Sequence, residues 1–543
     1  MRNHRYLQYT VYGLVLLFLG VGVIEPLRLL FVQSLQTSGV EGFTLHNIRA
    51  FFAQPRLINA LTNSLLVSTI VAGINIVLAT GIAYGIEKLH IPGRKLIKTI
   101  SIFPLYVPSL FPALGLIYLL GNQGIISAQI PGFELYGFTG VIIGCVVFTI
   151  PHGVLMLSTA MQNVDNTLYR VADTLGASEF KKFWSITIPN IKYALFNTFI
   201  VIFILSLTDF GVPKILGGQV SLLATEIYKE VIGQQNFGMG AALSLLLFIP
   251  VIIAAGIDVY IRFKQKDMKS MQNSGLQYRF GLKQRLFFGA GSWIVALGLV
   301  GILGMVVYGS FINFWPYDLT LTWANYDFEA IGFEWRGYFN SLKLAISVGI
   351  LGTILAFVSS YLVMRSSLQS GLKNTLSLVA LLPIAIPGTV LGLAYLFMIN
   401  AWPDLFNHFR GNMAFLTLNT TIHLFSVVFL TFSIHFHQMP KQYEQVGEST
   451  GVSPLQTIRR VIIPLSIPTG LEVFFFLAIN AMTTISAVIF LYSPETILAS
   501  ISILHMEESG AIASAAAMGT IIFLTCLVFR GIHLLIQSTL HEK

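Results

Sequence analysis

The sequence predicts an all-α membrane protein with about 12 transmembrane helices, arranged as two similar halves. Three observations predict this class. The 543 residues are 55% hydrophobic and only 10% charged, whereas a soluble domain carries roughly 25% charged residues. Long apolar runs recur along the chain, and residues 137–161 and 286–312 contain no Lys, Arg, Asp or Glu. Finally, short words from the first part of the chain recur in the second part at a nearly constant offset.

The apolar runs set the number of expected spans, because a run of about 20 apolar residues crosses the hydrocarbon core as a helix. The first run follows Arg2 and Arg5, as in a signal peptide. Glu25, Pro26 and Arg28 occupy the place of a small-residue cleavage site, so we expect a retained first helix. The expected spans lie near residues 7–33, 59–86, 97–120, 137–160, 190–208, 241–261, 286–312, 338–364, 374–399, 416–436, 465–491 and 513–537.

The Lys and Arg residues are unevenly distributed over the segments between the spans. With a cytoplasmic N-terminus, 24 of the 32 fall on the cytoplasmic side, as the positive-inside rule requires. This arrangement places both termini in the cytoplasm and explains the net charge of +8 without a nucleic-acid partner. The most basic segment, 262–285, holds seven Lys or Arg and one acid. We interpret it as a cytoplasmic linker between a first half at 1–261 and a second half at 286–543.

The evidence for the internal repeat comes from matches at polar, proline and glycine positions, because short apolar motifs match by chance in so hydrophobic a chain. A steady offset with small insertions and deletions indicates an ancient duplication. Each half has an even number of spans, so the halves share one orientation, are related by an axis along the membrane normal, and enclose a path between them. The matched positions are Asn63-Ser64-Leu65 with Asn340-Ser341-Leu342, Pro104 with Pro383, Pro108 with Pro387, Gly115 with Gly392, Gly176 with Gly451, and Pro189 with Pro464.

The strongest functional signal is a pair of long loops on the expected cytoplasmic side. In each loop a glycine, Gly176 or Gly451, precedes a proline, Pro189 or Pro464, by 13 residues. We expect a short helix before the glycine, a sharp turn with positive φ at the glycine, and a second helix that the proline ends. Such a helix–turn–helix is a docking element. Its predicted docking residues are Ala172, Gly176, Ala177, Ser178, Pro189, Gly451, Val452, Ser453 and Pro464.

These loops resemble the EAA loop of ABC importer permeases, whose pattern is Glu-Ala-Ala-x3-Gly-x9-Ile-x-Leu-Pro. Ala172 matches the second alanine of the pattern, and Gly447 replaces it in the second copy. Arg170 and Gln445 stand in place of the glutamate. The resemblance covers residues 60–537 and implies the type I ABC importer (MetI-like) permease fold, with two parallel six-helix repeats fused in one chain. It also implies that each loop inserts a coupling helix into a groove of a cytoplasmic ATPase.

The chain as a whole is most similar to the fused permeases of ferric-iron and 2-aminoethylphosphonate importers, and four stretches resemble the phosphonate-type members in particular. They lie at residues 208–214, 223–229, 232–237 and 483–494. The resemblance implies a small solute that a periplasmic binding protein delivers and that crosses a bacterial inner membrane. At this point 2-aminoethylphosphonate and ferric iron are both open as substrates.

Asp209, Thr483, Thr484 and Ser486 are candidates for the substrate path. Asp209 ends the fifth expected span, and Thr484 is its repeat partner, with Thr483 and Ser486 nearby. A carboxylate at that depth is costly and suggests function; a helix-end carboxylate at the interface is the simpler explanation. The hydroxyls either line the path or hydrogen-bond to neighbouring helices. We expect Asp209 and Thr484 on opposite sides of a central cavity.

The chain shows no motif for binding and hydrolysing ATP. A Walker A loop needs Gly-Lys followed by Ser or Thr, and no Gly-Lys dipeptide occurs. We expect no catalytic residue and no cofactor in this chain, and His435 and His437 lack a third ligand for a metal. The resemblance implies two copies of a partner ATPase that binds ATP and Mg²⁺. The alternative, an ion-coupled secondary transporter with parallel repeats, needs buried charges for coupling, and the spans hold few.

Overall fold

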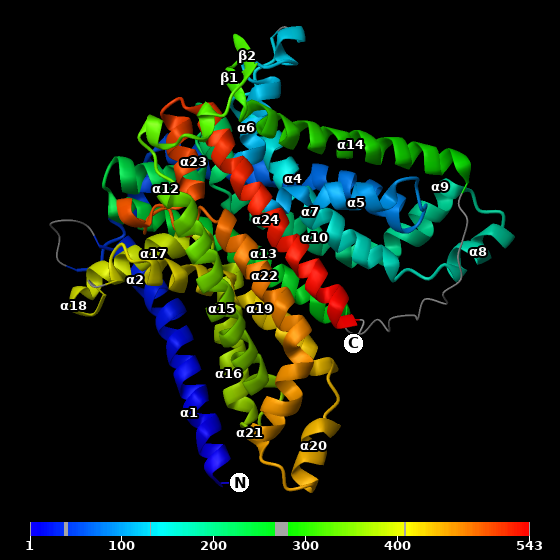
Figure 1. Cartoon of the computed structure of the whole chain (residues 1–543), viewed down its shortest axis with the longest axis vertical. Coiled ribbons are helices and arrows are strands. Elements are labelled where there is room, and N and C mark those ends of the chain that lie inside the picture. The colour runs from blue at the N-terminus through cyan, green and yellow to red at the C-terminus, as the bar shows by residue number, and fades with distance from the viewer. Residues whose placement is uncertain (1, 37–41, 131, 266–280, 407–408, 542–543) are drawn as a thin grey trace.

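The computed structural model describes residues 2–36, 42–130, 132–265, 281–406 and 409–541. Helices dominate this part of the chain (Figure 1). Ten of the helices found there are long and apolar enough to cross a membrane, and two further helix pairs qualify jointly, each with a sharp bend. The predicted all-α membrane class and the predicted number of spans are therefore confirmed.

The helices follow the repeat. The first half contains α1 (Arg2–Leu19), α2 (Glu25–Ser34), α3 (His46–Ala53), α4 (Pro55–Glu87), α5 (Arg94–Ile102), α6 (Leu110–Leu120), α7 (Phe138–Gln162), α8 (Thr167–Thr174), α9 (Glu179–Lys182), α10 (Ile188–Thr208), α11 (Gly211–Leu216), α12 (Leu223–Tyr228) and α13 (Phe237–Gln265). The second half contains α14 (Leu282–Gly309), α15 (Arg336–Met364), α16 (Ser370–Leu381), α17 (Gly388–Ala401), α18 (Pro403–Phe406), α19 (Met413–Gln438), α20 (Gln442–Ser449), α21 (Pro454–Thr457), α22 (Ile463–Thr483), α23 (Ala499–Glu508) and α24 (Ile512–His541). A small antiparallel hairpin of β1 (Ile312–Phe314) and β2 (Asp318–Leu321) follows α14.

Each half is built around the same three-helix core, in which α4 packs against α7 and α10, and α15 packs against α19 and α22. The repeated serine of the Asn-Ser-Leu words has the same task in both halves. The Leu223 N–H donates to Ser64 Oγ at 2.8 Å, and the Ala499 N–H donates to Ser341 Oγ at 2.9 Å. Each bond satisfies an otherwise free N–H at the start of a short helix, α12 or α23.

Two of the expected spans are bent. The axes of α5 and α6 differ by 109°, and those of α16 and α17 by 111°. The repeated prolines stand at these bends, Pro104 and Pro108 in one half and Pro383 and Pro387 in the other. A proline removes a backbone N–H and its ring clashes with the preceding helical turn, which accounts for the equivalent break in both halves.

The docking-loop prolines do not end a helix, and that expectation was wrong. Pro189 lies in the first turn of α10, and Pro464 lies in the first turn of α22. A π-helical turn precedes each of them, at Phe183–Thr187 and at Ile458–Ile462, so the helix continues through. Each proline closely follows a π turn, in which an N–H bonds to the carbonyl five residues back, so the regular α-helical ladder is already interrupted where the proline lacks an N–H.

The first helix of each half packs on the other half. In the first half, α1 contacts α15 and α16, and α2 contacts α17; in the second, α14 contacts α4, α5 and α6. The Tyr395 hydroxyl donates to the Gly22 carbonyl at 2.8 Å, and Trp293 Nε1 donates to the Pro92 carbonyl at 3.2 Å. The halves are therefore interlocked. Most of the predicted linker, at 266–280, lies outside the described residues.

Candidate functional site: two docking loops and the junction between the halves

Both loops have the predicted helix–turn–helix geometry. Helix α8 precedes Gly176 and α20 precedes Gly451, and the two glycines have φ values of +70° and +71°. The predicted positive φ is therefore confirmed in both copies. The residue after each glycine closes the preceding helix, in the bond that accompanies a left-handed glycine. These N–H groups donate at 2.9 Å from Ala177 to the Ala172 carbonyl and from Val452 to the Gly447 carbonyl.

The packing explains one departure from the family pattern. A Cβ added to Gly447 would lie 2.6 Å from Thr457 Oγ1, which is closer than a van der Waals contact allows. At the repeat offset of 275, Ala172 of the first loop corresponds to Gly447, and Lys182 corresponds to Thr457. The first loop therefore has no threonine at this position and accommodates an alanine at 172. Glycine at 447 is therefore required by its neighbour, and the turn itself is unchanged.

A serine starts the second helix of each loop. Ser178 Oγ accepts from the Lys181 N–H at 3.3 Å, and Ser453 Oγ accepts from the Gln456 N–H at 3.3 Å. Gln456 Oε1 in turn accepts from the Ser453 N–H at 3.2 Å, which completes a capping box. Both serines therefore fix the direction of the chain after the turn.

A lysine that sequence reasoning did not single out ties the first loop to the membrane helices. Lys88 caps the end of α4, and its Nζ donates to the Val164 carbonyl at 2.6 Å and to Asn166 Oδ1 at 3.1 Å. These acceptors lie just before α8. Burial lowers the pKa of Lys88 to about 8, while the charge of Asp165 opposes that shift.

An arginine has the same place in the second loop. Arg365 caps the end of α15, is 2% exposed, and pairs with Glu444 of α20. Its guanidinium also donates to the Met439 carbonyl at 2.7 Å and to the Pro440 carbonyl at 2.9 Å. Arg365 follows Lys88 at an offset of 277, the same offset as between the Asn-Ser words. This offset could have identified Lys88 and Arg365 as equivalent residues from the sequence.

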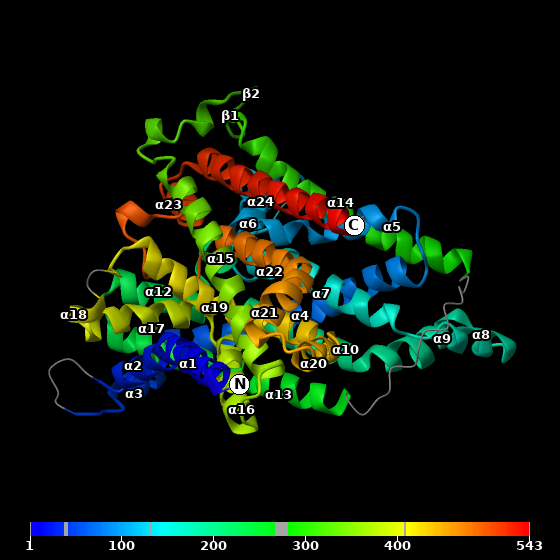
Figure 2. The same cartoon turned by 60° about the horizontal axis from the view of Figure 1, so that its bottom comes forward.

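The two loops present separate apolar surfaces. The helices α8 and α9 lie far from α20 and α21 in both views (Figures 1 and 2). Exposed apolar patches are typical of a surface that a partner covers. The exposed side chains of the loops are Leu175 at 80%, Phe180 at 74%, Trp184 at 54%, Val446 at 58% and Leu455 at 59%.

The structure places Asp209 at a break in the chain, directly after α10. Its Oδ2 accepts from the Val212 N–H at 3.0 Å, at the start of α11. Asp209 also lines a cavity of about 10 Å³ together with Ser64 and Ser206, and every lining residue comes from the first half. The carboxylate therefore caps a short helix within its own half.

The same break recurs after α22. Thr484 has φ −68° and ψ 140°, against −66° and 135° for Asp209. The expected span to residue 491 was wrong, because the helix ends at Thr483. The Thr483 hydroxyl donates back to the Ile479 carbonyl at 3.2 Å, and the Thr484 carbonyl accepts from Ser500 Oγ at 2.5 Å. Ser486 packs on Gly388, where an added Cβ would lie 2.4 Å from its Oγ.

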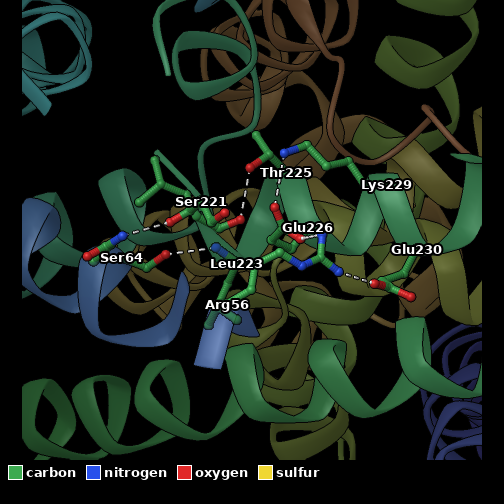
Figure 3. Close-up of polar contacts among 10 residues, drawn as sticks. Arg56, Ser64, Ser221, Leu223, Thr225, Glu226, Lys229 and Glu230 are labelled. Carbon is green, nitrogen blue, oxygen red and sulfur yellow. Dashed lines mark hydrogen bonds and ion pairs between the residues drawn. The ribbon is translucent and has the colours of Figure 1, made fainter. Parts of the chain in front are cut away.

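An ion cluster lies where the start of α4 meets α12 (Figure 3). Arg56 pairs with Glu226 and with Glu230, each at 2.7 Å. Lys229 pairs with Glu226 at 3.0 Å. The two carboxylates are 0% and 3% exposed, whereas Arg56 is 42% exposed. The charges of the two buried carboxylates are therefore balanced by cationic side chains that extend inward from the surface.

Of the two histidines weighed as metal ligands, His435 is held by hydroxyl groups of α22. The ring nitrogens of His435 lie 3.1 Å from Ser466 Oγ and 3.1 Å from Thr469 Oγ1. Among the residues that the structure describes, no three His, Cys, Asp or Glu side chains are grouped to hold a metal ion.

Comparisons with known proteins give the same twofold pattern. The family model described as "Binding-protein-dependent transport system inner membrane component" matches residues 75–267 and again residues 349–541. The chain is similar to the "Ferric transport system permease protein FbpB" of Actinobacillus pleuropneumoniae, with 27% identity over 94% of this chain and 76% of that protein. It is similar to the "Putative ferric transport system permease protein FbpB 1" of Haemophilus influenzae, with 27% identity over 89% of this chain and 77% of that protein. The "Spermidine/putrescine transport system permease protein PotB" of Haemophilus influenzae is 27% identical over 48% of this chain and 94% of its own length.

Proposed function

Because the chain belongs to the family of binding-protein-dependent transport system inner membrane components, we propose that it is the permease of a ferric-iron importer. The family is one of inner-membrane transport components, not of enzymes, and this chain has ten helices that are long and apolar enough to cross the membrane among its described residues. One observation supports ferric iron as the substrate. Relatives that match about nine-tenths of this chain are named for ferric transport.

The transport cycle that we propose uses both docking loops. Two copies of a cytoplasmic ATPase bind the loops, and a periplasmic binding protein delivers the substrate to the opposite face. ATP binding brings the two loops together and opens the halves toward the binding protein, and hydrolysis resets them. Lys88 and Arg365 support this cycle, because each ties a loop to a membrane-spanning helix, α4 or α15, so that a moving loop carries its half with it.

Uptake measured in cells tests the substrate. Cells that lack their own iron importers receive this permease with the ATPase and the binding protein that accompany it, and uptake of radioactive ferric iron is followed. We expect energy-dependent iron uptake that a large excess of 2-aminoethylphosphonate or spermidine does not reduce. Strong competition by either compound, or iron uptake equal to that of cells without the permease, would contradict the proposal.

We expect both termini and the 262–285 linker to face the cytoplasm, because 24 of the 32 Lys and Arg fall on that side in this orientation. Ser274→Cys tests the expectation, because the native Cys145 and Cys526 are buried. An impermeant thiol reagent should label this cysteine in inside-out vesicles and leave it unlabelled in right-side-out spheroplasts. The reverse pattern would overturn the topology.

The path role of Asp209 is separable from its capping role. Asn retains an oxygen that accepts from the Val212 N–H, whereas Ala does not. We propose that the charge serves the substrate path, and we expect Asp209→Asn to alter uptake without loss of folded protein. Asp209→Ala should also lower thermal stability by about 1 kcal/mol, the usual effect of a lost cap. Normal uptake by the Asn variant would leave only the capping role.

A further inference from the structure

An ion pair joins the two halves at the junction of their broken segments. Lys214 belongs to α11 of the first half, and Glu508 ends α23 of the second. Lys214 Nζ lies 2.7 Å from Glu508 Oε1, and the two side chains are 23% and 37% exposed. The pair is therefore partly buried. The attraction between two charges is stronger in such a partly buried site than in bulk water.

Aromatic and imidazole groups hold both ends of the pair. Lys214 Nζ lies 5.1 Å from the centre of the Tyr228 ring, within cation–π range. His505 Nδ1 lies 3.6 Å from Glu508 Oε2, and His505 Nε2 lies 2.9 Å from the Tyr492 hydroxyl. His505 and Lys214 lower the pKa of Glu508 to about 2, against the opposing effect of burial. Glu508 is therefore a carboxylate at neutral pH.

The repeat places this junction on the axis that relates the halves. The segment with α11 and α12 corresponds to residues 486–504, at offsets of 275 and 276. It contacts its own counterpart, because the Tyr228 and Phe490 ring centres lie 6.3 Å apart. Equivalent segments of two symmetry-related halves touch each other only at the axis. A path that runs between the halves along this axis therefore passes the junction.

The junction lies away from the docking loops. In both views α12 and α23 are well separated from α8 and α9 and from α20 and α21 (Figures 1 and 2). The two docking loops are themselves far apart, whereas the halves meet at the junction. The broken segments of the two halves are therefore in contact with each other at one end, while the docking loops lie apart at the other.

We infer that the Lys214–Glu508 ion pair is a latch that holds the path closed on the side away from the docking loops. The latch exists once, because the repeat counterpart of Lys214 is the uncharged Ile489. Opening the path toward the binding protein requires the two side chains to separate. Neutralising either partner therefore favours the open state, and exchanging the two charges restores the pair. The inference depends on the permease function but not on ferric iron as the substrate.

Thiol accessibility in the full chain tests the latch. Ser486→Cys places a conservative reporter in the second broken segment, and the native Cys145 and Cys526 are buried. In spheroplasts an impermeant maleimide is applied without substrate. We expect Glu508→Gln and Lys214→Met each to raise the labelling rate roughly fivefold, the factor that about 1 kcal/mol of ion-pair energy gives. The charge exchange Lys214→Glu with Glu508→Lys should return the rate toward that of the parent.

Glu507→Gln is the matched control, because it removes a negative charge one residue away and leaves the pair intact. Its labelling rate should equal that of the parent. The latch is refuted if both neutralising variants label like the parent, or if the charge exchange labels as fast as the single variants. Extracted protein from each variant is checked by size-exclusion chromatography, so that misfolding is not read as opening. Because labelling needs neither iron nor ATP, a failure of iron uptake leaves this result unaffected.

Discussion

Gly176→Val or Gly451→Val is expected to reduce ATP-dependent uptake at least about tenfold, because a β-branched residue resists the left-handed backbone that each turn requires. Both glycines have φ near +70°, and an added Cβ would meet nothing within 4 Å. The substitution therefore acts through the backbone alone and reorients the docking helix. Uptake in membrane vesicles and the amount of ATPase that copurifies with the permease both measure it.

Asparagine is the matched control for this prediction. It tolerates the left-handed region better than other residues with a side chain, and the open space at both turns accepts its amide. Gly176→Asn and Gly451→Asn should therefore keep most of the uptake and of the copurifying ATPase. Wild-type uptake by either valine variant at normal expression would contradict the docking role of that loop. Equal losses in the asparagine and valine variants would show that the backbone conformation is not the cause.

Arg56→Met is expected to destabilise the permease by about 3 kcal/mol, because it leaves Glu226 and Glu230 buried without their shared partner. The two carboxylates are 0% and 3% exposed and both lie 2.7 Å from Arg56. We take the lower end of the range for a broken buried pair, since Arg56 is itself 42% exposed. Lys229 keeps its contact with Glu226 and does not reach the second acid in this geometry. The melting temperature of the detergent-purified protein checks the result.

Removing the acids as well tests the explanation. In Arg56→Met with Glu226→Gln and Glu230→Gln, no buried anion is left unpaired, and most of the lost stability should return. The second half supports this expectation, because at an offset of 276 the counterpart of Glu226 is the uncharged Ser502. If the triple variant melts as low as Arg56→Met alone, the loss comes from packing of the arginine stem and not from the unpaired charges.

Much of the architecture could be predicted because it follows from local composition. Membrane spans require a minimum apolar length, since every backbone polar group must be satisfied inside the bilayer, and residues such as 137–161 meet that requirement visibly. The turns at Gly176 and Gly451 were predictable because only glycine adopts positive φ without cost. In the same way the repeated Asn-Ser words and prolines marked equivalent positions before their hydrogen bonds and bends were known.

Other features were predicted wrongly or missed because they depend on neighbours distant in sequence. Pro189 was expected to end a helix, yet the π turn before it carries the helix on. The run to residue 491 is apolar enough for a span, but the chain breaks at Thr484 and folds into the junction. Lys88 and Arg365 counted only as cytoplasmic charges, although each is bonded to carbonyls more than 70 residues away.

The sequence by itself determined the membrane class, the twofold repeat and the two glycine turns at Gly176 and Gly451, because each depends on residues close together in the chain. Only the tertiary structure decided which helices belong together in space. It placed α1 and α2 on the second half and α14 on the first, and it brought Lys214 to Glu508 across the junction. Such contacts depend on the shapes and charges of both surfaces at once, and no local pattern of apolar or charged residues encodes them.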